Sequence, residues 1–208
     1  MYVDDMIITG DDEKEIAQLK VRHRYFLGIE IAHGSKRIVL SQRKYALDLL
    51  AETGMLGCKP TATSIDQSFR LSAEIGETVD RKRYQRLVGR LLYLSHTRPD
   101  ISFVVSVVSR YMHDPSKGHM DAVYQILRYL KGAPGKGLRF RRSGHVNIEC
   151  YCDSDWASCR DDRRSTSGYC IFVRGNLVSW KSKKQSVVAR STAEAEYKAM
   201  ALGVAELM

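Results

Sequence analysis

Two aspartates stand two residues apart in the stretch "CYCDSDWAS", residues 150–158, which otherwise reads as a β-strand. Residues i and i+2 of a strand point to the same face of a sheet, so Asp153 and Asp155 are expected to share one face. Two like charges repel by about 4 kcal/mol at a separation of roughly 4 Å and an effective dielectric constant near 20. Solvent, a basic neighbour or a metal ion must offset this repulsion.

Lysine and arginine concentrate around this pair of acids. The chain has a formal net charge of +9, and residues 131–190 hold thirteen Lys and Arg side chains against five Asp and Glu. Residues 1–16, by contrast, hold six acids and one lysine. A basic stretch of this kind is either a solvated face or a surface that follows nucleic-acid phosphates. The candidate nucleic-acid-binding side chains are Lys181, Lys183, Lys184, Arg163 and Arg164.

Composition argues against several classes of protein. With 44% hydrophobic and 27% charged residues, the chain is of ordinary globular composition. No apolar run approaches the roughly 18 residues that a membrane span needs, so we expect no membrane partner. The first residues, "MYVDDMIITGDD", carry acids where a secretory signal peptide carries basic residues. We therefore expect an intracellular protein, in the cytoplasm or the nucleus, with reduced thiols at Cys58, Cys150, Cys152, Cys159 and Cys170.

The chain opens with short strands and helices. Residues 2–9 predict two short strands around a tight turn at Asp4 and Asp5, and residues 11–20 predict a helix. Residues 25–45 predict a hairpin that turns over the four residues "HGSK". An amphipathic helix is expected over residues 41–54, with Gly54 as its end.

The middle of the chain reads as a linker followed by core helices. Residues 58–80 lack periodicity and predict a linker or long loop. Apolar spacing then predicts helices over residues 82–97, 97–112 and 119–132, the second with Thr97 as its N-cap. The apolar stripe of the first of these helices consists of Tyr84, Leu87, Val88, Leu91 and Leu92. His96, His113 and His119 have no acid or cysteine at ligand spacing, so they read as ordinary polar residues.

The pattern changes to strands from residue 146 onward. Strands are expected over residues 146–156, 167–173 and 177–182, and a helix closes the chain. Ser191 and Glu194 fit a capping box, in which Glu194 turns back to the N-cap amide. This structural role leaves Glu196 free to project elsewhere. Trp156 and Trp180 could stack on bases, although their place in predicted strands favours core packing.

Several of these segments, taken in order, resemble one protein family. "YCDSDWAS", "STSGYCIFV", "LVSWKSKKQ" and "STAEAEYKAM" resemble the ribonuclease H domain of copia-type retrotransposon polyproteins, which are widespread in plants. Upstream, "YVDD" resembles the active-site hairpin of reverse transcriptase, "YFLGIEI" the strand before the thumb, and "TRPDIS" the helical connection. Each motif is weak alone, but together they cover essentially the whole chain in the expected order.

The resemblance implies an α+β fold in three segments. Residues 1–57 would be a reverse-transcriptase palm hairpin and the start of the thumb, and residues 58–145 a linker with the helical thumb and connection. Residues 146–208 would be the N-terminal half of a ribonuclease H-like domain, an incomplete β-sheet with one helix.

The resemblance also implies site residues and partners. Asp153 and Glu196 would be metal-binding carboxylates of the ribonuclease H site, with Asp155 auxiliary or on the surface. Asp4 would be a Mg²⁺ ligand of the polymerase site and Asp5 its neighbour. Both sites would use two divalent cations held by clustered carboxylates. The implied partners are RNA, DNA, RNA–DNA hybrid and other segments of the polyprotein.

The chain departs from the family's pattern at three places. It starts at "MYVDD", so the fingers, most of the palm and an earlier catalytic aspartate are not included. Only "VRHR" stands between the predicted helix at 11–20 and "YFLGIEI", where the family carries a strand and a turn. The sequence stops at "AELM", before the further aspartates of a ribonuclease H site.

Three functional hypotheses follow. The first is a fragment of a retrotransposon polyprotein, related to RNA-directed DNA polymerase with ribonuclease H activity and catalytically inactive alone. The second is a non-catalytic nucleic-acid-binding module that retains the basic stretch. The third is an enzyme that another polyprotein segment completes with the missing parts.

Overall fold

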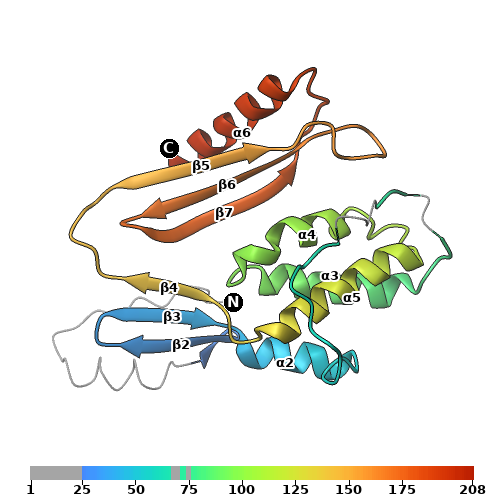
Figure 1. Cartoon of the computed structure of the whole chain (residues 1–208), viewed down its shortest axis with the longest axis horizontal. Coiled ribbons are helices and arrows are strands. Elements are labelled where there is room, and N and C mark those ends of the chain that lie inside the picture. The colour runs from blue at the N-terminus through green and yellow to red at the C-terminus, as the bar shows by residue number, and fades with distance from the viewer. Residues whose placement is uncertain (1–24, 67–70, 74–75) are drawn as a thin grey trace, which may run out of the picture.

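The structure, a computed structural model, describes residues 25–66, 71–73 and 76–208. The strands predicted at 2–9, the helix predicted at 11–20, and with them Asp4 and Asp5, lie outside these residues. The described chain is α+β, as predicted. A four-stranded sheet continues into a group of four helices, and a separate three-stranded sheet with its own helix lies above them (Figure 1).

The first sheet is antiparallel with strands in chain order. Its strands are β1 (Tyr25–Phe26), β2 (Ile29–Gly34), β3 (Arg37–Ser41) and β4 (Leu138–Arg141). The single strand expected at "YFLGIEI" is wrong, because Leu27 and Gly28 both take positive φ angles, 48° and 77°, and form a two-residue turn. The hairpin from β2 to β3 is present as predicted, with Gly34 paired to Arg37.

Strand β4 was not anticipated from the sequence. It pairs with β3, from which about a hundred residues of chain separate it, with Leu40 opposite Leu138. The approach to β4 is close, since a Cβ atom on Gly137 would lie 2.0 Å from the carbonyl oxygen of Leu40. Glycine is therefore required where the chain re-enters the sheet.

Four helices form the main hydrophobic core, which we call the helical core. They are α2 (Arg43–Glu52), α3 (Arg81–Leu94), α4 (Pro99–Ser109) and α5 (Lys117–Gly132). The four helices predicted over residues 41–54, 82–97, 97–112 and 119–132 are therefore present. Gly54, with φ 70°, ends α2 as predicted, because the amides of Gly54 and Met55 bond to the carbonyls of Ala51 and Leu50 in a Schellman arrangement.

Two details of the predicted helices are wrong. Leu92 is 40% exposed, and Leu94 takes the buried place at the end of the α3 stripe. The N-cap of α4 is Arg98 rather than Thr97, whose hydroxyl instead donates to Oε1 of Gln42 at 2.8 Å. Both differences arise from tertiary contacts, which the periodicity of the sequence does not record. These contacts decide that Leu94 is buried and that the Thr97 hydroxyl bonds to Gln42.

A buried ion pair stands where α4 begins. The guanidinium group of Arg98, almost fully buried, donates to both carboxylate oxygens of Asp100 at 2.9 and 3.0 Å and to the carbonyl of Ala133 at 2.9 Å. The Tyr129 hydroxyl donates to the same carboxylate at 2.7 Å, and Lys136 pairs with it at 3.0 Å. This group fixes α4 to the end of α5.

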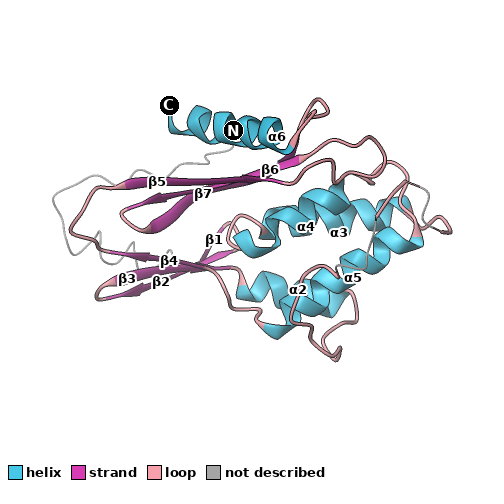
Figure 2. Ribbon diagram, turned by 45° about the horizontal axis from the view of Figure 1, so that its top comes forward, coloured by secondary structure: helices cyan, strands magenta, loops and turns pink. Residues whose placement is uncertain are grey.

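The C-terminal part forms a second antiparallel sheet with one helix, which we call the sheet unit. It comprises β5 (Ile148–Ser154), β6 (Thr166–Val173), β7 (Asn176–Lys184) and α6 (Thr192–Leu207), in the strand order β5-β6-β7. The three predicted strands and the closing helix are thus confirmed. Helix α6 covers one face of the sheet, and α4 approaches β7 from the opposite face (Figure 2).

The proposed division at residues 57 and 145 stays a prediction. The described elements before and after residue 57 share one sheet and one core, since β4 completes the sheet of β1–β3 and α2 packs against α3 and α5. Within the described residues, no helix has the length and apolar character needed to cross a membrane. All five cysteines carry free thiols.

Candidate functional site

The alternation of β5 decides which side chains face which helix. Cys150 and Cys152 point toward α6, where their Sγ atoms lie 3.5 Å apart beneath Gly203. Asp153, the next residue along the strand, therefore points to the other face, toward α4. Burial beneath α6 and a hydrogen bond with Cys150 raise the pKa of the Cys152 thiol to about 11.

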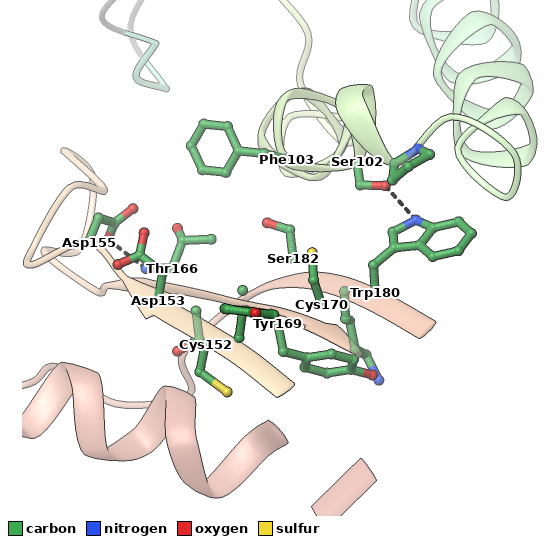
Figure 3. A pocket seen from close by; sticks show the side chains of 15 residues that line it. Ser102, Phe103, Cys152, Asp153, Asp155, Thr166, Tyr169, Cys170, Trp180 and Ser182 are labelled. Carbon is green, nitrogen blue, oxygen red and sulfur yellow. Dashed lines mark hydrogen bonds between the residues drawn. The ribbon is translucent and has the colours of Figure 1, made fainter. Parts of the chain in front are cut away.

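A cavity of about 500 Å³ lies between α4 and the face of the sheet that carries Asp153. Its walls include Phe103 and Ser102 of α4 and Trp180 of β7. Figure 3 shows the carboxylates of Asp153 and Asp155 together at one end of this space, with α6 on the far side of the sheet. The two acids of the "CDSD" stretch thus share one face, as their spacing predicted.

The two acids differ in their surroundings. Oδ1 of Asp155 accepts a hydrogen bond from the backbone amide of Thr166 at 2.7 Å, and the Asp155 amide donates to the Thr166 carbonyl at 3.2 Å. Asp155 thus extends the β5–β6 pairing by one residue. Arg110, which follows the last residue of α4, donates to the Thr166 hydroxyl at 2.8 Å, which brings a cation to the same place. Asp153 is exposed to solvent. An amide, a nearby guanidinium group and water therefore offset the repulsion between the two acids.

Glu196 lies in α6, across the sheet from the cavity that Asp153 lines. The negative charge of Glu196 contributes to the raised pKa of Cys152, a residue of the α6 face. The side chain of Asp153 points away from α6 (Figure 3). The described residues contain no group of three or more His, Cys, Asp or Glu side chains that could hold a metal ion. The joint binding of a Mg²⁺ ion by Asp153 and Glu196 therefore stays a prediction.

Glu194 has the structural role predicted for it, with one difference. The Ser191 hydroxyl accepts from the Glu194 amide at 3.2 Å, as in a capping box. The Glu194 carboxylate, however, accepts from the amide of Arg190 at 2.8 Å, one residue before the N-cap. It also pairs with Lys198 at 2.8 Å, and the bonds from Lys198 and Arg190 lower the pKa of Glu194.

The five basic candidates are not equivalent. Asp162 pairs with Arg164 at 2.5 Å and with Lys184 at 2.8 Å, and hydrogen bonds from Arg164 and Lys184 hold the pKa of Asp162 well below its usual range. Part of the charge of Arg164 and Lys184 is thereby neutralised. Lys181, Lys183 and Arg163 are exposed and form no salt bridge within the described residues.

Polar contacts hold the sheet unit against α4. The indole of Trp180 donates to the Ser95 carbonyl at 3.2 Å and lies 3.1 Å from the Ser102 hydroxyl. The hydroxyls of Ser106 and Ser182 lie 3.1 Å apart. Trp180 is therefore a packing residue, as predicted, although its partner is a helix far away in the sequence. Trp156 is not in a strand and is half exposed, so core packing was the wrong expectation for it.

Comparison with known proteins shows to which family the chain belongs. No family model matches it, and no solved structure does either. An uncharacterized mitochondrial protein of Arabidopsis thaliana, AtMg00810, is 39% identical over 219 residues, which span all of this chain and 91% of that protein. The retrovirus-related Pol polyprotein from transposon RE2 of the same plant is 41% identical over 220 residues. The chain belongs to the copia-type retrotransposon Pol family.

The match to the Pol polyproteins is confined to one part of them. All of this chain aligns with the RE2 polyprotein but covers only 15% of its length. The retrovirus-related Pol polyprotein from transposon TNT 1-94 of Nicotiana tabacum is 38% identical over 95% of this chain and 16% of its own length. These matches confirm the resemblance to copia-type Pol proteins that the motifs indicated.

Proposed function

We propose that the chain is a Pol segment derived from the end of a reverse transcriptase and the beginning of a ribonuclease H, which contacts nucleic acid and has no turnover alone. The observation that carries this proposal is the position of Asp153 on one face of the β5–β6–β7 sheet and of Glu196 in the helix on the other. Two-metal phosphoryl transfer needs carboxylates that converge on the same two ions.

The order of the elements supports the assignment to a ribonuclease H-like unit. Three antiparallel strands are followed by one helix, with Asp153 near the end of the first strand and Glu196 in the second turn of the helix. Upstream, we propose that the helical core corresponds to the thumb and connection that the resemblance implies. Mg²⁺ is the cofactor expected of the family, and we propose that it binds to an assembled polyprotein rather than to this segment alone.

Helix α4 adds a physical reason for low activity of the isolated segment. Phe103 and Ser102 stand across the cavity from Asp153, and the polar contacts of Trp180 and Ser182 hold α4 in that position. A nucleic-acid duplex is too wide for a cavity of about 500 Å³. Access of a hybrid to Asp153 is therefore confined to the side on which this residue is exposed to solvent.

A hybrid-cleavage assay with Mg²⁺ tests the proposal. We expect no cleavage of a labelled RNA–DNA hybrid by the purified chain, and the same result for Asp153→Asn and for Glu149→Gln, an exposed acid on the same face of β5. Cleavage that Asp153→Asn abolishes and Glu149→Gln leaves intact would contradict the proposal. Cleavage that appears only after a complementary polyprotein segment is added would favour an enzyme completed by another chain.

A non-catalytic nucleic-acid-binding module is the second candidate. The observation that favours it is the pair Lys181 and Lys183, exposed two residues apart on the edge strand β7 without a salt bridge in the described chain. Binding of this kind weakens steeply as salt rises, because phosphate contacts release counterions. We expect the double variant Lys181→Glu, Lys183→Glu to weaken hybrid binding and to flatten its salt dependence, whereas Lys36→Glu in the β2–β3 turn leaves both unchanged.

The remaining predictions about partners and location are part of the same proposal. RNA, DNA, RNA–DNA hybrid and other polyprotein segments stay the predicted partners. An intracellular location, in the cytoplasm or the nucleus, also stays a prediction.

A further inference from the structure

Two loops lie side by side at one end of the sheet unit. One joins β5 to β6 over residues 155–165, and the other joins β7 to α6 over residues 185–191 (Figure 1). The amide of Gln185 donates to the Ser165 carbonyl at 2.8 Å, and a guanidinium nitrogen of Arg164 lies 3.3 Å from the Ser186 carbonyl. We call this pair of loops the loop platform.

Trp156 is the largest exposed apolar side chain of the loop platform. The residue is 52% exposed, yet its indole N–H donates to the carbonyl of Ala189 in the second loop at 3.1 Å. The ring is therefore held at one edge while a large part of its surface stays open to solvent. Val187 and Val188 of the second loop are also about half exposed.

The loop platform is held by several further hydrogen bonds. The Ala157 amide donates to the Ser165 hydroxyl at 3.0 Å, and the Arg163 amide donates to the Cys159 carbonyl at 2.8 Å. Ala157 and Arg163 take positive φ angles of 53° and 58°, which make the sharp bends of the first loop. A surface fixed in this way loses little conformational entropy when a ligand binds.

The same two loops carry exposed arginines, and the acids Asp161 and Asp162 of the first loop have other partners. Arg160 and Arg163 of the first loop and Arg190 of the second are exposed and form no salt bridge within the described residues. Asp161 accepts from the amide of Ala73 and from the Tyr111 hydroxyl, and Asp162 is paired as described above.

We propose that the loop platform binds single-stranded nucleic acid, with Trp156 stacking on an unpaired base and Arg160, Arg163 and Arg190 contacting phosphates. This inference rests on the proposed function and deepens it, since it names a binding surface apart from Asp153. An open aromatic ring on a pair of loops that also carries exposed guanidinium groups suits a polyanion with flat bases, and stacking of this kind is tolerant of sequence. A base within a duplex is stacked on its neighbours and does not present its face.

The chain contains only two tryptophans, so fluorescence reports directly on Trp156. In the variant Trp180→Phe, Trp156 is the single tryptophan, and we expect a single-stranded oligothymidylate of about 12 nucleotides to quench its emission in a saturable way. Trp156→Ala should weaken binding of the oligonucleotide about 5- to 100-fold, and Trp156→Phe should retain most of the affinity. If Trp180→Phe does not fold, the difference in emission between the wild type and Trp156→Phe gives the same readout.

Tyr197→Ala is the matched control. Tyr197 is an aromatic residue of the same unit that is 71% exposed and lies in α6 rather than in either loop, so its removal should leave the affinity unchanged. Undiminished binding by Trp156→Ala, together with no quenching of Trp156 in Trp180→Phe, overturns this inference and leaves the proposed function standing. No binding of the oligonucleotide, with hybrid binding intact, also overturns it. Loss of both kinds of binding in the wild type contradicts the nucleic-acid contact of the proposed function itself.

Discussion

The helical core and the sheet unit differ in the kind of side chain that they bury. The helical core buries large apolar side chains, Leu49, Leu87, Leu91, Ile126 and Leu127 among them, almost completely. The sheet unit buries small residues of α6 against the strands, namely Ala195, Ala199 and Gly203. Its interior also holds Gln185, whose side-chain amide bonds to the Ser167 hydroxyl at 2.9 Å and the Ala195 carbonyl at 3.0 Å.

This contrast locates stability and chemistry in different places. Burial of large apolar side chains dominates the free energy of folding, so the helical core should carry most of it. The residues proposed for function lie in the sheet unit, which depends on close fit and on polar contacts. Three sets of variants test this contrast, in order of decreasing effect.

The largest effect is expected at the buried ion pair of the helical core. Asp100→Asn leaves the almost fully buried Arg98 without its carboxylate, and loss of one partner of such a pair costs about 3–5 kcal/mol of unfolding free energy. The control Asp48→Asn removes an exposed carboxylate paired with Lys44 and should cost less than about 0.5 kcal/mol. Chemical denaturation measures both, and equal costs would mean that the ion pair does not hold the core.

The same pair predicts a pH dependence. Burial alone would raise the pKa of Asp100, but hydrogen bonds from Arg98 and Tyr129 outweigh burial and hold this pKa well below its usual range. The stabilisation is therefore present above the unfolded-state pKa, near about 3.9, and is lost as pH falls through the lower folded-state value. The stability difference between wild type and Asp100→Asn should stay constant from neutral pH to about 4.5 and narrow only in stronger acid.

The next effect compares two adjacent leucines of α3. Leu91 is fully buried and Leu92 is 40% exposed. Leu91→Ala should lower the unfolding free energy by about 2–5 kcal/mol, because it removes buried methyl groups and leaves a cavity. Leu92→Ala should cost less than about 0.5 kcal/mol. Similar denaturation midpoints for the two variants would show that this face of α3 is not packed as described.

The smallest effect compares two helical glycines, one in each region. A Cβ at Gly203 would lie 2.4 Å from Sγ of Cys152 and 2.8 Å from Sγ of Cys150, whereas one at Gly89 of α3 meets nothing within 4 Å. Gly203→Ala should destabilise the sheet unit by about 1–3 kcal/mol through overpacking. Gly89→Ala should stabilise the chain by up to about 1 kcal/mol, since alanine favours helix. A stabilising Gly203→Ala would show that α6 does not lie close on β5.

Local patterns in the sequence were sufficient for most elements. The period of α3 and α5, the alternation of β5 and the end of α2 at Gly54 all follow from side chains within one or two turns of each other. The shared face of Asp153 and Asp155 followed from their spacing. Strand β4 was missed because its partner, β3, is about a hundred residues away and the apolar–basic alternation of "LRFR" extends over only four residues.

The roles of individual polar residues depended on tertiary contacts. Alternation showed that Asp153 and Cys152 face opposite ways but not which of them α6 covers. The pairing of Lys184 with Asp162 joins β7 to a loop twenty-two residues earlier, so sequence alone counted Lys184 as available to phosphate. Trp156 was assigned to a strand that in fact ends at Ser154, and only the two-loop arrangement shows its ring to be open.

Strand β5 has a neighbour on one side only in the described chain, and its charges have a consequence for self-association. If two copies paired antiparallel along this edge about Tyr151, Glu149 of each copy would stand opposite Asp153 of the other. Like charges placed directly across two strands destabilise their pairing. Charged side chains on edge strands commonly disfavour edge-to-edge association of sheets in this way. The acids of β5 thus disfavour pairing of two copies of the chain along this edge.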